Sequence, residues 1–403
     1  MKLYTLILAA VAFAANVQAQ LTVVSAASYD SDSVLAPGSI GSAFGQNLAP
    51  AVEAATTAPL PTVLQGVRVT ITDGALQTKD CPLFFVSPTQ INFLLPDGLA
   101  EGPGFIRLRA AAALGEEGAE QVLQEGTITI ANVAQGLFFQ TDLEWLAGFL
   151  VRVAADGTQT RESIYHAVNG EIVPRVLELS PGGDESEQFY LEGYGTGFRN
   201  VGGVDSVVVA VGNATSQNGF TQFDRVPVLY VGPAPGFDGL DQFTVGPLSR
   251  RLEYFGGTDA PVALFTQERS SNVAWMQIAP NPNAPVVSNL DFQNAPGALR
   301  YQFDFSDADG DLGAGAMVVT IEDAGGFCTS IIQLPPATFN GRTSGRADFQ
   351  LAKGQGRQLT GVLGAVVSIS DGADHISNTT SWEPAMPGAL SDYVESCQVY
   401  EPK

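Results

Sequence analysis

The sequence predicts an all-β protein made of several β-sandwiches in tandem. Short runs in which apolar and polar residues alternate recur along most of the chain, and turn-forming residues separate them, with 44 glycines and 24 prolines among 403 residues. Only one segment has the composition of a helix. Many short strands with Gly and Pro turns are typical of sandwiches or barrels, and this length allows two to four domains.

Composition and charge exclude two classes of protein. With 45% hydrophobic and 15% charged residues, the chain is too apolar for intrinsic disorder. Asp and Glu number 42 against 19 Lys and Arg, which gives a formal net charge of −23. This excess repels phosphate backbones and anionic lipid surfaces, so we expect no nucleic-acid partner.

Residues 1–19 have the features of a signal peptide. Lys2 supplies a positive start, and Leu3–Ala15 is an almost unbroken apolar run. A membrane-spanning helix needs ~20 apolar residues, and the polar residues Asn16 and Gln18 interrupt the run too early. We expect cleavage near Ala19 and an exported chain with no transmembrane segment after cleavage.

Strand patterns follow from residue 20 onward. Val67–Thr72 alternates apolar and polar residues and runs into an Asp73–Gly74 turn, and Trp145–His166 carries a hairpin pattern with Asp156–Gly157 at its turn. The other strand-like runs are 105–109, 127–130, 207–211, 226–230, 262–265, 273–278, 300–305, 317–321 and 365–369. Ala110–Gln124, rich in Ala, Glu and Leu, is either a helix or a long loop inserted between two strands.

An internal repeat relates residues 39–110 to residues 186–265. The matching pairs are Phe44–Leu48 with Tyr194–Phe198, Val67–Gly74 with Val207–Gly212, and Pro82–Pro88 with Pro227–Pro233. The period of about 150 residues is far longer than the ~20 to 50 residues of solenoid repeats. We therefore expect two related domains, 20–133 and 134–280.

A proline-rich spacer precedes a third domain. Ala279–Pro285 contains three prolines, which cannot donate ladder hydrogen bonds and favour extended backbone. About seven strand-like runs follow it, the number that an immunoglobulin-like sandwich needs. Residues 281–403 are therefore predicted to form such a sandwich.

Several motifs within residues 21–280 together carry a family resemblance. They are Val24–Ser28, Ala36–Ser39, Phe44–Leu48, Pro59–Gly66, Pro82–Pro96, Tyr194–Gly197 and Tyr230–Gln242. In these motifs the chain resembles the uncharacterised Solibacter-type C-terminal domain found in acidobacterial exported proteins. The resemblance implies a pair of IPT/TIG-type immunoglobulin-like modules and brings no catalytic residues. The family unit usually ends a longer chain, whereas here a third domain follows it.

The sharpest local signal is a group of closely spaced aspartates. They are Asp304, Asp307, Asp309 and Asp311. Carboxylates on a turn can supply the hard oxygen ligands that Ca²⁺ prefers, but an EF-hand is excluded because Leu312 and Val318 stand where it needs Gly and Glu. The alternative is a solvated acidic turn. Asp371, Gly372 and Asp374 would complete a calcium site if their loop lies at the same end of the sandwich.

The chain has three cysteines, and we expect it to be exported to an oxidising compartment. Because three is an odd number, one thiol must stay free or pair elsewhere. Cys328 and Cys397 share the third predicted domain, so we expect a disulfide between them. Cys81 directly precedes the apolar run Pro82–Val86 and is predicted to be a free, buried thiol.

The sequence contains no recognisable catalytic motif. The patterns GxSxG, HExxH and SxxK are absent, and the two histidines, His166 and His375, lie more than 200 residues apart in the sequence. No cofactor is expected apart from possible Ca²⁺. Phe237, in a loop rich in Pro and Gly, is a candidate ligand-binding side chain, although it could instead plug the end of its own sandwich.

These observations favour an exported, non-catalytic interaction or adhesion module at the cell surface or outside the cell. Its partner would be a protein or a carbohydrate. Two alternatives stay open. One is a secreted, glycosidase-like hydrolase with paired carboxylates between domains, and the other is a purely structural spacer.

Overall fold

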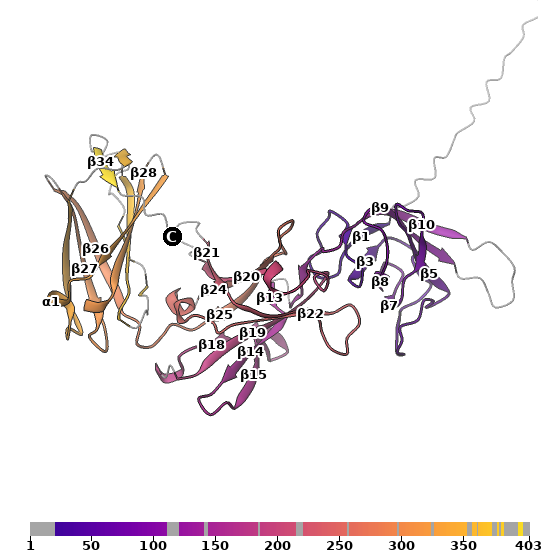
Figure 1. Ribbon diagram of the computed structural model, residues 1–403, viewed down its shortest axis with the longest axis horizontal. Coiled ribbons are helices and arrows are strands. Elements are labelled where there is room, and N and C mark those ends of the chain that lie inside the picture. Colours follow the sequence, from indigo (N-terminus) through magenta and orange to yellow (C-terminus); the bar gives the residue numbers. More distant parts are fainter. Residues whose placement is uncertain are drawn as a thin grey trace, which may run out of the picture. The chain divides into compact units, whose positions relative to one another are not determined.

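The computed structural model describes thirteen stretches of the chain (Figure 1). They are residues 21–110, 121–140, 144–183, 186–214, 221–255, 258–295, 298–323, 326–352, 357–360, 362–372, 377–378, 380–382 and 394–397. Strands account for about 53% of the residues, and the described part contains a single α-helix, α1 (Pro336–Phe339). The prediction of an all-β protein is confirmed.

The helices in these stretches are short, with three to six residues each. None of the described helices has both the length and the apolar character needed to cross a bilayer. The predicted signal peptide, residues 1–19, lies outside the described residues and stays a prediction.

The chain divides into two compact units. Unit 1 is Met1–Gly136 together with Thr196–Asn200 and Pro235–Leu240, and unit 2 is Leu137–Gly195, Val201–Ala234 and Asp241–Lys403. Two short segments from the second half of the predicted repeat thus belong to unit 1. Apart from these segments and residues 134–136, the second and third predicted domains, 134–280 and 281–403, both fall in unit 2 and stay predictions as separate domains.

The first sandwich, within unit 1, consists of two five-stranded sheets. One has the order β1 (Thr22–Ser25), β3 (Ile40–Phe44), β8 (Gln90–Leu94), β7 (Leu83–Val86), β4 (Glu53–Ala54). The other has the order β2 (Val34–Leu35), β10 (Val122–Ile130), β9 (Gly102–Ala110), β5 (Val67–Thr72), β6 (Thr78–Asp80). Both sheets contribute to one core, in which Ile71, Phe93 and Leu108 are fully buried. The predicted strand at 67–72 is confirmed.

The helical interpretation of Ala110–Gln124 is wrong at its described ends. Ala110 ends β9, and Val122–Gln124 begins β10, which pairs antiparallel with β9. Ala, Glu and Leu favour a helix only weakly, and pairing of the backbone along a whole strand outweighs that preference. Residues 111–120 lie outside the described residues.

The second pair of sheets carries the other half of the repeat. One sheet has the order β15 (Gln159–Ser163), β14 (Gly148–Val153), β19 (Gln188–Thr196), β23 (Asp241–Val245), β22 (Val228–Pro233), and β11 (Gly136–Leu137) also pairs with β19. The other has the order β12 (Phe139–Gln140), β13 (Trp145–Leu146), β25 (Ala274–Ile278), β24 (Thr258–Phe265), β20 (Val208–Ala214), β21 (Thr221–Val226), and β18 (Val176–Leu177) also pairs with β25. A separate hairpin joins β16 (Tyr165–Val168) to β17 (Glu171–Pro174), and η1 (Pro181–Gly183), η2 (Val204–Ser206) and η3 (Arg250–Phe255) are short 3-10 turns.

Strand order bears out the predicted repeat. The order β3-β8-β7 in the first sandwich corresponds to β19-β23-β22, and β10-β9-β5-β6 corresponds to β25-β24-β20-β21. Even a detail of direction is shared, because the short β2 runs parallel to β10 as β18 runs parallel to β25. The two halves of the repeat therefore have one topology. The hairpin at Asp156–Gly157 is also present, between β14 and β15.

The predicted spacer is shorter than its prolines suggest. The side-chain amide of Asn281 is buried and donates hydrogen bonds to Ser180 Oγ (3.2 Å) and Glu253 Oε2 (2.9 Å). The backbone N–H of Ala279 donates to Leu177 O (2.8 Å). Residues 279–281 are thus bonded to the elements that precede them.

The third sandwich has a three-stranded and a four-stranded sheet. Their orders are β26 (Val286–Ala295), β27 (Ala298–Ser306), β30 (Ser344–Ala352) and β29 (Gly326–Gln333), β28 (Ala316–Asp323), β32 (Val362–Ile369), β33 (Thr380–Trp382). A short ladder joins β31 (Arg357–Thr360) to β34 (Val394–Cys397), and η4 (Leu312–Ala314) precedes β28. Phe303 from the first sheet and Val319 and Val367 from the second are buried in one core. This two-sheet arrangement is immunoglobulin-like.

Candidate metal centre

Three of the predicted ligands lie on the tight loop that joins β27 to η4. Asp307 directly follows β27, and its backbone N–H donates to Thr343 O (2.9 Å). Gly310 adopts φ 74°, a left-handed conformation that glycine enters without steric cost. The backbone N–H of Ala314 then donates to Asp311 O (3.0 Å) and closes the turn of η4. The loop therefore holds Asp307, Asp309 and Asp311 close to one another.

A second loop brings a fourth aspartate to the same place. After β32, the backbone N–H of Ser370 donates to Ala316 O (2.7 Å), which fixes the end of β32 beside the start of β28. Asp371 follows directly, and the backbone N–H of Gly372 donates to the carboxylate of Asp311. The 371–374 loop thus lies at the same end of the sandwich as the first loop, as the calcium site requires, and it contributes Asp371. Asp374 lies outside the described residues.

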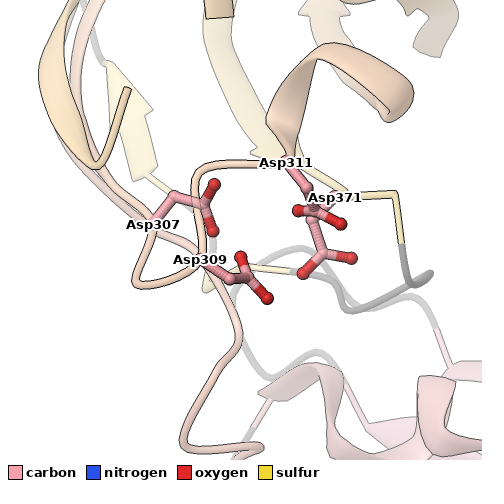
Figure 2. Close-up of side chains that lie close together, drawn as sticks. All are labelled: Asp307, Asp309, Asp311 and Asp371. Atoms are coloured by element: carbon pink, nitrogen blue, oxygen red, sulfur yellow. The ribbon is translucent and has the colours of Figure 1, made fainter. Parts of the chain in front are cut away.

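The four carboxylates point toward one another (Figure 2). One oxygen each from Asp307, Asp309, Asp311 and Asp371 lies within 4.8 Å of the other three. Asp307 and Asp371 are each only 2% exposed, whereas Asp309 is exposed to solvent. Two short chain segments thus place four acidic oxygens around one point.

Part of this acidic group is buried without a hydrogen-bond partner. Oδ2 of Asp307 accepts a hydrogen bond from the Leu312 N–H (3.3 Å). Oδ1 of Asp307 and Oδ1 of Asp311 are buried, and no group in the described part of the chain donates a hydrogen bond to either. A buried carboxylate oxygen without a donor is costly, so each of these oxygens calls for an electropositive partner.

The electrostatics of the group agree with this geometry. Burial, reinforced by the neighbouring Asp309, raises the pKa of Asp307 to about 7. Burial and then the charge of Asp371 raise the pKa of Asp311. Both shifts disfavour the anionic form, and a bound cation would oppose them.

Asp304, the remaining predicted ligand, lies elsewhere. Its carboxylate accepts hydrogen bonds from the Asn289 amide (2.8 Å) and the Arg346 guanidinium (2.9 Å). These two contacts, the Asn289 bond first, lower the pKa of Asp304. Asp304 therefore belongs to a partly exposed ion pair between neighbouring strands, and the structure groups only Asp307, Asp309 and Asp311 of the predicted set.

The structure describes the side chain of Cys81 but not those of Cys328 and Cys397. Cys81 is free and fully buried in the core of the first sandwich, and burial raises the pKa of its thiol well above the ordinary value. Cys328 and Cys397 lie in β29 and β34, but their side chains are outside the described part of the structure, so their disulfide stays a prediction.

Phe237 is a surface residue. Its side chain is 66% exposed, and it lies in the segment Pro235–Leu240 of unit 1. Its predicted role in ligand binding stays a prediction.

Comparisons with known proteins add no family. No family model matches the chain, and no curated protein matches it. Among solved structures, a tetra-tandem repeat from the extending region of a large adhesion protein is 13% identical, with 91% of this chain and 99% of that chain covered and a TM-score of 0.17. An auxiliary nutrient-binding protein from Bacteroides thetaiotaomicron is 10% identical, with 90% and 97% covered and a TM-score of 0.18. A DUF4785 family protein from Legionella pneumophila is 10% identical, with 92% and 85% covered and a TM-score of 0.21. At TM-scores this low, none of these likenesses supports an inference about function.

Proposed function

We propose that the chain is an exported, non-catalytic interaction module that binds Ca²⁺ in its third sandwich. The ligands are the carboxylates of Asp307, Asp309, Asp311 and Asp371. The observation that carries the proposal is that Asp307 belongs to a group of four close carboxylates while its buried Oδ1 has no donor among the described residues. A hard divalent cation supplies the missing partner for these oxygens.

The dimensions of the group fit calcium. Ca²⁺ binds oxygen at about 2.3–2.6 Å, so ligands on opposite sides of the ion lie about 4.6–5.2 Å apart. Mg²⁺ binds at about 2.0–2.1 Å, which limits that separation to about 4.2 Å. The four oxygens all lie within 4.8 Å of one another, so one calcium ion can contact all four. One face of the site stays open through the exposed Asp309, which leaves room for water ligands.

The interaction role is supported by different features. Tandem sandwiches present loops at their ends, and such loops on a rigid scaffold commonly carry binding residues. Phe237 offers an exposed aromatic side chain on one such loop, suited to a protein or a carbohydrate partner.

Isothermal titration calorimetry of the metal-free full chain with CaCl₂ tests the calcium site. We expect saturable binding by the unsubstituted chain and at least about tenfold weaker binding by Asp309→Asn, a loss of ~1.4 kcal/mol. Asp309 is exposed, so its substitution leaves the core intact.

Asp304→Asn is the matched control, because it removes the same charge three residues from Asp307 but outside the cluster. Its affinity for Ca²⁺ should equal that of the unsubstituted chain. Absence of binding heat in the unsubstituted chain, or equal losses in the two variants, would contradict the proposed site.

A further inference from the structure

We infer that the bound cation joins the two sheets of the third sandwich, so that Ca²⁺ controls whether this end of the domain is closed. The inference rests on the proposed calcium site and concerns what binding does to the protein. It follows from where the ligands sit in the sheet topology.

The ligands come from both sheets. Asp307 directly follows β27, in the three-stranded sheet, and the loop that carries it continues through η4 to β28 of the other sheet. Asp371 lies two residues beyond β32, a central strand of the four-stranded sheet. A cation held by Asp307 and Asp371 is therefore bonded to the ends of two strands in opposite sheets.

The nearby backbone hydrogen bonds mostly run within one sheet or its extension. Asp307 N–H donates to Thr343 O next to β30, and Ser370 N–H donates to Ala316 O in β28. Each of these bonds stabilises one sheet. Where the carboxylates face each other, the Gly372 N–H donates to the Asp311 carboxylate, so the contact between the two loops there involves the acidic cluster itself.

One described tie between the sheets lies at the same end. The Asn378 side chain accepts from Val287 N–H (2.9 Å) and donates to Val287 O (2.8 Å), and Val287 pairs with Phe305 near the end of β27. The mutual repulsion of those cluster carboxylates that are ionised opposes this uncharged tie. Without a cation this repulsion favours separation of the sheet ends, and with Ca²⁺ the same groups hold them together.

Hydrogen–deuterium exchange of the full chain, with and without saturating Ca²⁺, tests the inference. In the unsubstituted chain, Ca²⁺ should slow exchange at least tenfold in two separate segments, residues 307–312 and residues 369–372. In Asp371→Asn, at a Ca²⁺ concentration that calorimetry shows to be saturating, protection should persist in 307–312 and be lost in 369–372. Asp304→Asn should behave as the unsubstituted chain.

The outcomes separate the inference from the proposed function. If calorimetry shows binding but Ca²⁺ protects only 307–312 in the unsubstituted chain, the cation does not join the sheets and the inference is wrong, while the site stands. If calorimetry shows no binding, the proposed site fails and the inference fails with it. The result for the unsubstituted chain decides the matter even if Asp371→Asn does not fold.

Discussion

Asp304 and Asp307 are the same residue type three positions apart, yet they have opposite environments. Phe303 and Phe305, on β27, point into the core, so Asp304 between them faces outward and meets Arg346 on β30. Asp307 lies two residues after Phe305, just beyond the strand end, so its side chain points inward as those of Phe303 and Phe305 do, and it is 2% exposed. The alternation of side chains along a strand, extended one step past its last residue, therefore separates the ion-pair aspartate from the cluster aspartate.

This alternation was available in the sequence, because the run at 300–305 was predicted as a strand. The prediction grouped Asp304 with the other aspartates because it used only their spacing in the sequence and not the directions of their side chains. The contribution of Asp371 depended on which loops meet at one end of the sandwich. Contacts between residues more than 60 positions apart are set by the packing of sheets, which no local pattern encodes.

The raised pKa of Asp307 predicts how stability depends on pH in metal-free buffer. The pKa of the Asp307 carboxyl is 3.8 in the unfolded chain and about 7 in the folded chain. Between these pH values the folded chain therefore binds more protons than the unfolded chain. The contribution of Asp307 to the free energy of unfolding is therefore fully present below about pH 4 and is lost as the pH rises toward 7. Asp307→Asn keeps the neutral form at every pH.

Differential scanning calorimetry at several pH values checks this. The melting temperature of the unsubstituted chain should fall relative to that of Asp307→Asn as the pH rises from 4 to 7. A difference that stays constant or grows in favour of the unsubstituted chain would show that burial does not raise this pKa.

At the scale of elements, the loops of the candidate site are positioned by close backbone packing. A Cβ atom on Gly315, between η4 and β28, would lie 1.8 Å from the carbonyl oxygen of Ser370. The start of β28 and the end of β32 can approach this closely only because residue 315 has no side chain. The position of Asp371 relative to the 307–311 loop thus depends on a glycine that is not itself a ligand.

Gly315→Ala is accordingly expected to displace the segment that carries Asp371. Overpacking of this kind costs about 1–3 kcal/mol in the free energy of unfolding. Because one ligand moves away, the affinity for Ca²⁺ should also fall about tenfold or more. Thermal melting and titration calorimetry measure the two effects.

Gly74→Ala provides the matched control, because a Cβ there meets only Pro103 O at 3.4 Å, an ordinary contact. It should change neither quantity. Unchanged calcium affinity in Gly315→Ala would mean that the contact with Ser370 does not position Asp371.

At the scale of the whole molecule, the sequence predicted the fold class and the internal repeat. It failed where the helix-favouring composition of a segment conflicted with the strand pairing of that segment. Apolar alternation located β5, and matching motifs located strands that occupy equivalent places in two sheet pairs. Val122–Gln124 was open to a helical interpretation because helix-forming residues dominate its surroundings, whereas β10 pairs there with β9, the strand that precedes it in the sequence. The anchoring of Asn281 was likewise hidden, since its partners Ser180 and Glu253 lie far away in the sequence.

Each sandwich with its own core should respond separately to calcium. The first and third sandwiches have distinct buried clusters, and the carboxylates belong only to the third. Ca²⁺ at 100 times its dissociation constant should stabilise that sandwich by ~2.7 kcal/mol, which raises the melting temperature of a domain of this size by several degrees.

Scanning calorimetry of the full chain in EDTA and in millimolar Ca²⁺ measures this shift. One transition should move to higher temperature while the others keep their positions, and Asp309→Asn should reduce the shift. Equal movement of all transitions would indicate that calcium acts on the chain as a whole and not at this site.

The complete burial of Cys81 bears on how the predicted disulfide between Cys328 and Cys397 would form if the chain is exported. Thiol–disulfide exchange requires an accessible thiolate, and Cys81 offers neither access nor the charged form once the first sandwich has folded. Because domains commonly fold in order from the N-terminus, this third thiol would be withdrawn before β34 is available. The core of one sandwich would thereby act as a protecting group, leaving Cys328 and Cys397 to oxidise without a competitor.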